Sequence, residues 1–286
     1  IQELDKVLVI VNLKKHAGQL YGLIGNEEGN FHLSTNMCPA HRIVTLKKIQ
    51  SRLKNGQTCR LISTQCVEAG VDIDFPIVYR AMAPLDSIIQ AAGRCNRNGN
   101  WENSSFTVFL PSLEDERYPG NIYEYGAVTL KTMQSEMPEA DISSTSYISE
   151  YFRRFYSDIE TDFDFDEALM SKDFNAVHQK YQWIKQYANN ILVPFNGELG
   201  LYDSLADEAR RSGINKKWMR KATNLSVNAS VRESQPINNI VEPLFVRKPD
   251  GKKSNEESGW YILVDKTAYS DSYGLDVNVN NLDFLA

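Results

Sequence analysis

The chain has 286 residues, of which 42% are hydrophobic and 24% charged, and its formal net charge at pH 7 is −6. This composition excludes a disordered or fibrous protein, and the length predicts two domains that each bury a hydrophobic core. The longest apolar run, at 7–11, is too short to span a bilayer and no signal peptide is visible, so we expect a cytoplasmic protein without a membrane partner.

The negative charge is concentrated in the middle of the chain. Residues 1–110 hold 12 basic and 9 acidic residues, residues 111–173 hold 5 and 15, and residues 174–286 hold 14 and 13. The local field matters more for nucleic-acid binding than the total charge does. A basic surface at either end of the chain is therefore compatible with the negative net charge of the whole sequence.

The first 112 residues alternate strands with helices. Short apolar runs predict strands at 7–12, 31–34, 59–63, 77–81 and 106–110. Apolar residues at helical spacing predict helices at 14–24, 39–53 and 85–92. This alternation is typical of an open α/β domain with a parallel sheet and flanking helices, in which ligands bind beyond the carboxyl ends of the strands.

After Pro111 the pattern changes. Residues 113–188 are predicted to form an acidic linker and helical region, with helices near 121–135, 147–159 and 166–187. Residues 189–286 are predicted to form a smaller mixed α/β accessory domain, with a helix near 201–211 and strands near 190–195, 225–231, 243–248 and 259–264.

Short hydroxyl side chains follow two of the predicted strands. Ser34 and Thr35 follow one strand, and Ser63 and Thr64 follow another. Because the carboxyl ends of parallel strands share one edge of a sheet, these four residues are candidates for one shared site. Such groups beside backbone amides hold a phosphodiester backbone without discriminating its sequence. The alternative, which the residues taken alone favour, is that they cap the helices that follow.

Two arginines, Arg94 and Arg97, follow a glycine at the end of a predicted helix. On a helix, a spacing of three places both guanidinium groups on one face, where they suit the transition-state charge on a γ-phosphate. The alternative is a surface salt bridge, although Asp86 is the only acidic residue near them in sequence.

Two further residues fit a nucleotide less specifically. Asp72, shortly after Gly70, could accept a ribose hydroxyl or could end a turn. Gln90 could contact a nucleotide or could simply lie exposed on its helix.

The sequence also lacks half of an ATPase site. No G-x-x-x-x-G-K-[ST] loop occurs, and the glycine-bounded turn at 25–30 carries two glutamates instead of a lysine. The acidic pair Asp115-Glu116 lies downstream of the arginines, where we expect it to be a false match to a Mg²⁺-binding pair. The 4 cysteines and 4 histidines are scattered, so we expect structural thiols in a reducing cytosol and no metal site.

Four phrases resemble the second RecA-like domain of superfamily-two helicases, and more closely the CRISPR-associated helicase–nuclease of type I systems. They are VLVIVNLKK (7–15), HLSTNMCPAHR (32–42), STQCVEAGVDIDFP (63–76) and QAAGRCNRNG (90–99). Two further phrases, at 219–230 and 260–277, resemble the carboxyl-terminal domain of that family more weakly.

The resemblance implies an ATP-dependent translocase that pulls single-stranded DNA from a target marked by a CRISPR surveillance complex. It places along the DNA path Asn12, Ser34, Thr35, Arg42, Ser63 and Thr64. It places against ATP Gly70, Asp72, Gln90, Arg94 and Arg97, with Arg97 as the arginine finger. The family's HD nuclease and first RecA-like domain, which would bind most of the ATP and Mg²⁺, are not found in this sequence. The resemblance therefore implies that this chain alone neither hydrolyses ATP nor cleaves DNA.

Two alternatives remain. The first is a non-enzymatic module that binds nucleic acid or protein, because basic residues at 210–221 surround Trp218 and suit single-stranded nucleic acid if that ring is exposed. The contrary interpretation is a solvated helix face with Trp218 and Met219 turned inward. The second alternative is a restriction or repair translocase of the same superfamily, which would share only the RecA-like part.

Overall fold

The structure is a computed structural model that describes residues 1–111, 118–158, 170–174, 189–229 and 236–276. The predicted domain boundaries after residues 112 and 188, the pair Asp115-Glu116 and most of the helix expected at 166–187 fall outside these ranges.

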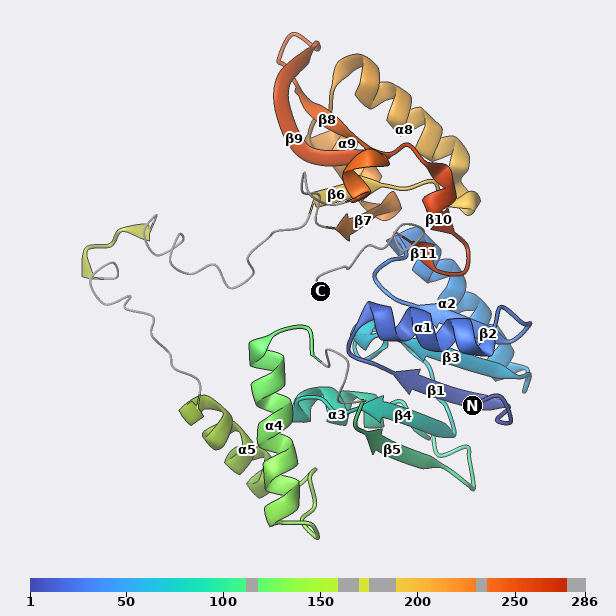
Figure 1. Cartoon of the computed structure of the whole chain (residues 1–286), viewed down its shortest axis with the longest axis vertical. Coiled ribbons are helices and arrows are strands. Elements are labelled where there is room, and N and C mark those ends of the chain that lie inside the picture. Colours follow the sequence, from blue (N-terminus) through green and yellow to red (C-terminus); the bar gives the residue numbers. More distant parts are fainter. Residues whose placement is uncertain (112–117, 159–169, 175–188, 230–235, 277–286) are drawn as a thin grey trace.

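The first part of the chain forms the predicted parallel sheet, with the strand order β2-β3-β1-β4-β5 (Figure 1). Its strands are β1 (Lys6–Ile10), β2 (Asn30–Leu33), β3 (Cys59–Ser63), β4 (Ile77–Ala81) and β5 (Ser105–Phe109). Its helices are α1 (Lys14–Ile24), α2 (Pro39–Lys54), the short 3₁₀ helix η1 (Gln65–Val67) and α3 (Leu85–Ala92). The predicted alternation of strands and helices is therefore confirmed.

Both faces of the central strand β1 are buried, which explains its unbroken apolar run. Val7 and Val9 pack with Ala17 and Tyr21 of α1 on one face. Leu8 and Ile10 pack on the other face, in a cluster that includes residues of α2 and α3. Because successive side chains of a strand point to opposite faces, helices on both sides require apolar residues at every position.

The helices α4 (Asn121–Glu136) and α5 (Thr145–Asp158) form a hairpin next to α3. The Tyr151 hydroxyl donates to the carbonyl of Gly126 at 3.1 Å and accepts the amide of Leu85 at 3.3 Å. A Cβ atom at Gly126 would lie 2.9 Å from the Cβ of Pro84, so a glycine is needed for this close packing. The acidic region therefore packs onto the RecA-like sheet through an apolar cluster that includes Leu85 and Tyr151.

The accessory part contains a mixed four-stranded sheet with the order β7-β6-β9-β8, as predicted for this region. Its strands are β6 (Asn189–Leu192), β7 (Ser226–Ala229), β8 (Val241–Arg247) and β9 (Lys253–Leu263). Its helices are α8 (Leu199–Ser212) and α9 (Lys216–Ala222), with 3₁₀ turns η2 (Asn196–Glu198), η3 (Thr223–Leu225) and η4 (Pro236–Asn239). The strand β9 begins earlier than predicted because its first residues are polar and form an exposed arm paired with β8, which gives no apolar alternation.

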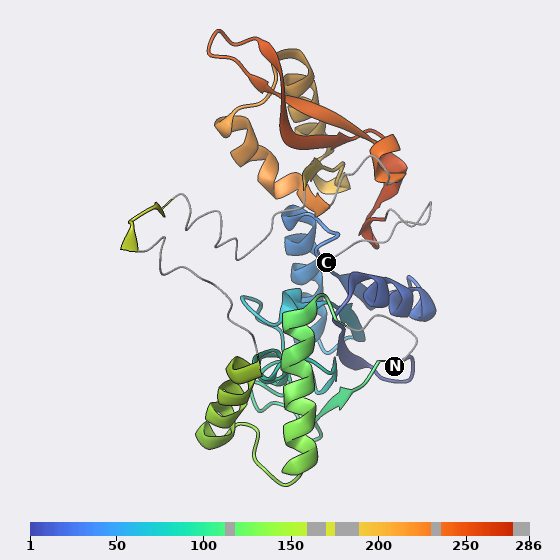
Figure 2. The ribbon, with the colours of Figure 1, turned by 60° about the vertical axis from the view of Figure 1, so that its left-hand side comes forward.

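A strap at residues 266–276 joins the accessory part to the RecA-like part. It contains η5 (Lys266–Ala268), β10 (Tyr269–Ser270) and β11 (Gly274–Leu275), and Figure 2 shows it reaching the blue helices α1 and α2. The amide of Leu275 donates to the carbonyl of Asn36 at 2.7 Å. The amide of Cys38 donates to the Tyr269 hydroxyl at 3.1 Å. These bonds fix the strap beside the segment between β2 and α2.

His41 completes the strap contact. Its Nε2 lies 3.1 Å from the carbonyl of Asp271 and its Nδ1 lies 2.9 Å from the Tyr269 hydroxyl. Because a carbonyl only accepts, Nε2 carries the proton and Nδ1 accepts from the tyrosine. Burial lowers the pKa of His41, which favours this neutral form. Its ring also stacks on Phe195 with centroids 4.7 Å apart.

Candidate functional site

The carboxyl ends of β1, β2 and β3 meet at one edge of the sheet, as the sequence predicted. This carboxyl edge, defined by Asn12, Ser34, Thr35, Ser63 and Thr64, holds polar residues at or shortly after the ends of the three strands. The backbone amide of Val11 donates to the carbonyl of Ser63 at 2.9 Å, and the amide of Thr64 donates to the carbonyl of Leu33 at 3.2 Å. Neighbouring strand ends are therefore bonded to one another.

Most side chains of the carboxyl edge are buried. The exposed fractions are 3% for Asn12, 0% for Ser34 and Ser63, and 4% for Thr64. Thr35 is exposed and Arg42, in the first turn of α2, is half-buried. A ligand at this edge would therefore meet Thr35 and Arg42 first.

The buried hydroxyl groups bond to nearby backbone instead of capping helices. Ser63 Oγ donates to the carbonyls of Leu33 at 2.9 Å and of Thr64 at 3.0 Å. Ser34 Oγ accepts the amide of Asn36 at 3.2 Å. The helix α2 begins after Cys38, and Thr64 precedes η1 without a side-chain cap. The helix-capping alternative therefore does not apply to these residues.

Asn12 belongs to a buried network that reaches beyond β1. Its Nδ2 donates to the carbonyl of Met82 at 2.9 Å, and its Oδ1 accepts from Arg80 Nη1 at 2.7 Å. Gln65 Nε2 donates to the carbonyl of Asn12 at 3.0 Å. Asn12 therefore connects the end of β1 with β4 and with η1.

The expectation of a helix that presents both arginines on one face is wrong. The helix α3 ends at Ala92, before Gly93, and Asn96 has a φ of 49°. Asparagine tolerates this left-handed conformation better than most residues, and the turn that it forms interrupts the helical period. The guanidinium groups of Arg94 and Arg97 consequently lie in different surroundings.

Arg94 is buried and holds the backbone of the η1 segment. It is 9% exposed, its Nε donates to the carbonyl of Val67 at 3.0 Å, and its Nη2 donates to the carbonyl of Glu68 at 2.6 Å. Burial lowers its pKa, and the nearby charge of Arg97 acts in the same direction. These bonds position the loop that carries Arg97.

Arg97 lies on a loop that is fixed through its backbone. The carboxylate of Asp74 accepts the amide of Arg97 at 2.8 Å and the amide of Asn98 at 3.1 Å. The guanidinium of Arg97 is exposed and lies 3.4 Å from the carboxylate of Asp72. The surface salt bridge is therefore present with Asp72 instead of Asp86, and exposed pairs of this kind contribute only about 0–1 kcal/mol.

The residues predicted to face a nucleotide lie away from the carboxyl edge. Gly70 (φ 70°), Asp72, Gln90 and Arg97 are all exposed. Cys95 makes a parallel bridge with Phe75, just before β4 begins, and the Arg97 loop leads into the start of β5. We call this side of the sheet the amino edge. The segment from Thr64 to Asp74 runs from the carboxyl edge to the amino edge. It therefore links the residues predicted to contact DNA with those predicted to face the nucleotide.

Three buried or partly buried charged residues of these networks were missed by the sequence reasoning. Asp74, Glu68 and Arg80 carry no distinctive spacing, and only the D-x-D pattern at 72–74 could have pointed to Asp74. Their partners are 12 or more residues away in sequence, so a local pattern contains no signal for them.

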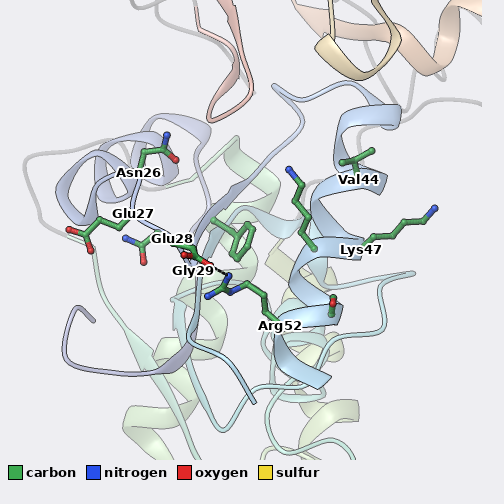
Figure 3. A pocket seen from close by; sticks show the side chains of 11 residues that line it. Asn26, Glu27, Glu28, Gly29, Val44, Lys47 and Arg52 are labelled. Carbon is green, nitrogen blue, oxygen red and sulfur yellow. Dashed lines mark hydrogen bonds and ion pairs between the residues drawn. The ribbon is translucent and has the colours of Figure 1, made fainter. Parts of the chain in front are cut away.

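A groove of about 660 Å³ lies between the turn at 26–31 and α2, away from the residues predicted to contact DNA or nucleotide (Figure 3). Arg52 on α2 and Glu28 on the turn form an ion pair of 2.8 Å there. None of the sequence-predicted site residues lines this groove. The groove carries both signs of charge, from Glu27 and Glu28 on the turn and from Lys47, Lys48 and Arg52 on α2. That the glycine-bounded turn is a poor nucleotide cradle stays a prediction from the sequence.

The basic run at 210–221 does not surround an exposed aromatic ring. Trp218 is 1% exposed, and its Nε1 donates to the carbonyl of Leu205 at 2.9 Å. Of the two alternatives left open by the sequence, the stacking platform is therefore contradicted and the inward-facing interpretation is confirmed for Trp218. The charged residues around it are exposed, and Arg210 pairs with Glu242 at 2.9 Å.

Among the residues that the structure describes, no group of three or more His, Cys, Asp or Glu could hold a metal ion. In the same ranges, no helix combines the length and apolarity needed to cross a bilayer. All four cysteines are free thiols, and burial raises the pKa of Cys59 to about 12.

Comparison with known proteins connects this geometry to one family. Residues 3–100, which include both edges, match the family model of the carboxyl-terminal part of the CRISPR-associated nuclease/helicase Cas3. The Cas3 protein of Haloferax volcanii is 28% identical over 238 residues, which cover 69% of this chain and 24% of that protein. By these matches, the chain is similar to the carboxyl-terminal part of Cas3 helicase–nucleases. The Cas3 protein of Methanothermobacter thermautotrophicus is 24% identical over 176 residues, covering 54% of this chain and 21% of that protein.

The chain spans about a quarter of the length of these curated Cas3 relatives. An uncharacterized ATP-dependent helicase of Methanocaldococcus jannaschii is also similar, with 24% identity over 225 residues that cover 75% of this chain and 32% of that protein.

Solved Cas3 structures share the fold. The crystal structure of T. fusca Cas3 matches with a TM-score of 0.56 and 14% identity over 90% of this chain and 35% of that chain. A chain of a CRISPR RNA-guided surveillance complex in a pre-nicking state matches with a TM-score of 0.55 and 12% identity over 94% of this chain and 40% of that chain. The predicted RecA-like sheet with an accessory mixed domain is thus confirmed as a Cas3-like fold.

Proposed function

We propose that this chain supplies the second RecA-like domain and the accessory domain of an ATP-dependent, single-stranded DNA translocase of type I CRISPR interference. The observation that carries the proposal is the Arg97 loop, which lies within the region that matches the Cas3 family model. Asp74 fixes the backbone of this loop while the Arg97 guanidinium stays accessible. A fixed backbone with a free cationic tip is what an arginine finger requires.

On the nucleotide side, Arg97 would stabilise the charge on the γ-phosphate of ATP. Gly70, Asp72 and Gln90, which are exposed, would face the same nucleotide. Arg94 would act on Arg97 through the loop, because its own guanidinium is bonded to two backbone carbonyls. A first RecA-like domain outside this sequence would hold most of the ATP and its Mg²⁺, which supplies charge neutralisation at the phosphates.

On the DNA side, the carboxyl edge would follow the phosphate backbone of a single strand. Exposed Thr35 and half-buried Arg42 would contact phosphates. Asn12, Ser34, Ser63 and Thr64 would hold those strand ends in place, since their side chains are buried.

ATP binding would close this domain against the first RecA-like domain, and hydrolysis would reopen the cleft. Repeated closure would move the domain along the strand, as in other ligand-driven domain movements. A structurally similar chain was solved in a CRISPR RNA-guided surveillance complex. We therefore propose a complex of that class as the partner that recruits the protein, and DNA degradation as the outcome.

Replacing Arg97 tests the proposal in a protein that contains this chain and a first RecA-like domain. Arg97→Ala is expected to lower DNA-stimulated ATP hydrolysis by about 10³-fold or more while DNA affinity is kept. Arg153→Ala is the matched control, because Arg153 is an exposed, ion-paired arginine on α5, away from both edges. Wild-type turnover in Arg97→Ala would refute the role of Arg97.

The match to the Methanocaldococcus jannaschii helicase favours a second candidate, a superfamily-two translocase that works outside CRISPR interference. The two candidates differ in recruitment. Loading onto DNA that depends on a surveillance complex supports the first, and equal activity on any single-stranded DNA without such a complex supports the second.

A further inference from the structure

An ion pair is buried where the two edges of the sheet are connected. Arg80 Nε lies 2.8 Å from Glu68 Oε1, and the two side chains are 0% and 6% exposed. Arg80 stands in β4, whose other residues are Ile, Val, Tyr and Ala, and Glu68 directly follows η1. The pair thus joins the central part of the sheet to the segment that runs between the edges.

Stability alone gives little reason for such a pair. Removing two charges from water costs several kcal/mol, and apolar residues of similar volume are commonly as stabilising or more so. Burial raises the pKa of Glu68, and the charge of Arg80 acts in the opposite direction. The other contacts of the two residues indicate what the pair fixes.

Arg80 extends from the ion pair toward the carboxyl edge. Its Nη1 donates to Asn12 Oδ1 at 2.7 Å and to the carbonyl of Ala81 at 2.9 Å, and its Nη2 donates to the hydroxyl of Tyr123 at 2.6 Å. Because Gln65 also bonds to the carbonyl of Asn12, a displacement of Asn12 would shift the hydrogen-bond partners in both β4 and η1.

Glu68 extends from the ion pair toward the amino edge. Its backbone carbonyl and that of Val67 accept the two bonds from Arg94. The carbonyl of Arg94 in turn accepts the amide of Phe75 at 3.0 Å, beside the Arg97 loop. Asn12, Arg80, Glu68 and Arg94 therefore form a continuous series of short polar contacts between the two edges.

We propose that Glu68 and Arg80 are positioning residues that couple occupancy of the carboxyl edge by single-stranded DNA to the placement of the Arg97 loop. The inference rests on the proposed function, and neither residue touches DNA or nucleotide. Two charges in a low-dielectric interior have few alternative arrangements, so the pair transmits a shift instead of absorbing it. Without the pair, both edges persist but respond independently.

The test removes the pair as a unit, because loss of one partner would leave a buried unpaired charge. The double variant Glu68→Met/Arg80→Met keeps roughly the same side-chain volumes without charge. The matched control is Glu208→Met/Arg247→Met, which removes a 2.8 Å pair in the accessory part whose arginine also bonds to a backbone carbonyl. Both are made in a protein that contains this chain and a first RecA-like domain.

The quantity measured is the ratio of ATP hydrolysis rates with and without saturating oligo-dT. Glu68→Met/Arg80→Met is expected to lower this ratio at least about tenfold, within the usual range of coupling between sites, while DNA affinity and basal rate stay near wild type. Its melting temperature is expected to fall, because Asn12, Ala81 and Tyr123 lose the buried donor that Arg80 supplies. The control is expected to keep the ratio. An unchanged ratio in the folded variant overturns the inference, and so does a parallel fall of basal rate and DNA affinity, which marks a merely structural role.

A second measurement does not depend on ATP hydrolysis. Oligo-dT added to the 286-residue chain is expected to slow amide hydrogen exchange at residues 93–99 in the wild type and not in Glu68→Met/Arg80→Met. Slowed exchange in both overturns the coupling role while leaving the proposed function intact. Absence of DNA binding by the wild type refutes the DNA side of the proposed function, and the coupling with it.

Discussion

Asp74 holds Arg97 by its backbone amide, while the side chain of Arg97 stays exposed. Asp74 Oδ1 accepts the amide of Arg97 at 2.8 Å, whereas the Arg97 side chain is 47% exposed and its guanidinium lies 3.4 Å from Asp72. The two aspartates therefore differ in what they do for the same arginine. Asp74 fixes the backbone of the Arg97 loop, and Asp72 weakly orients the Arg97 guanidinium group.

Asp74→Ala is expected to lower DNA-stimulated ATP hydrolysis by about 10²-fold, because the loop loses its carboxylate bonds and Arg97 is misplaced. The loss should appear in kcat with little change in KM for ATP, as measured by steady-state kinetics in a protein with both RecA-like domains. Asp203→Ala, which removes an exposed carboxylate that pairs with Lys266 in the accessory part, serves as the control. Equal activity of the two variants would contradict the role given to Asp74.

Arg42→Ala is expected to reduce the salt dependence of single-stranded DNA binding by this chain. Loss of one phosphate contact should reduce the slope of log K against log salt by about 0.7. Fluorescence anisotropy at several salt concentrations measures the slope. Arg211→Ala provides the comparison, because Arg211 is an exposed arginine on α8 outside the carboxyl edge. If only Arg211→Ala changed the slope, DNA would bind the accessory domain instead.

Gly274→Ala is expected to destabilise the strap. Gly274 has a φ of 75°, and a Cβ atom there would collide with the carbonyl of Asn36. Gly251→Ala is a matched control, because its φ is 85° and a Cβ atom there would meet nothing within 4 Å. Both variants bear the conformational cost of about 1 kcal/mol, so an extra loss of unfolding free energy in Gly274→Ala measures the collision. Urea unfolding gives both values, and equal losses would show that the strap adapts without cost.

Acid is expected to destabilise the chain through His32. Burial among Tyr21 and Tyr273 lowers the pKa of His32 from 6.5 to about 4. Below pH 6.5 the unfolded chain therefore binds a proton that the folded chain does not, so stability is lost as the pH falls toward 4. Between pH 7 and pH 5 this amounts to about 2 kcal/mol. Burial also lowers the pKa of His41, which adds a loss of the same sign.

His32→Phe keeps an aromatic ring and removes the titrating group. Urea unfolding at pH 7 and pH 5 should therefore show a smaller difference in this variant than in the wild type. An identical pH dependence would assign the acid sensitivity to other groups.

The sequence by itself determined the α/β architecture, the carboxyl edge and the resemblance to one helicase family. An apolar run such as 7–11 needs helices on both faces of its strand, and parallel strands bring the residues that follow them to one edge. These are properties of local order along the chain. They can therefore be inferred from residues that are neighbours in sequence.

Only the tertiary structure decided that Arg94 and Arg97 act differently. The helix ends at Ala92, and the partners of Arg94 are carbonyls 26 and 27 residues away. It also decided that Glu68 and Arg80 meet in the core, and that Trp218 turns inward. Each of these outcomes depends on which distant backbone or side chain folds against the residue. Spacing along the chain does not encode that, because burial and hydrogen bonding are decided by packing between elements.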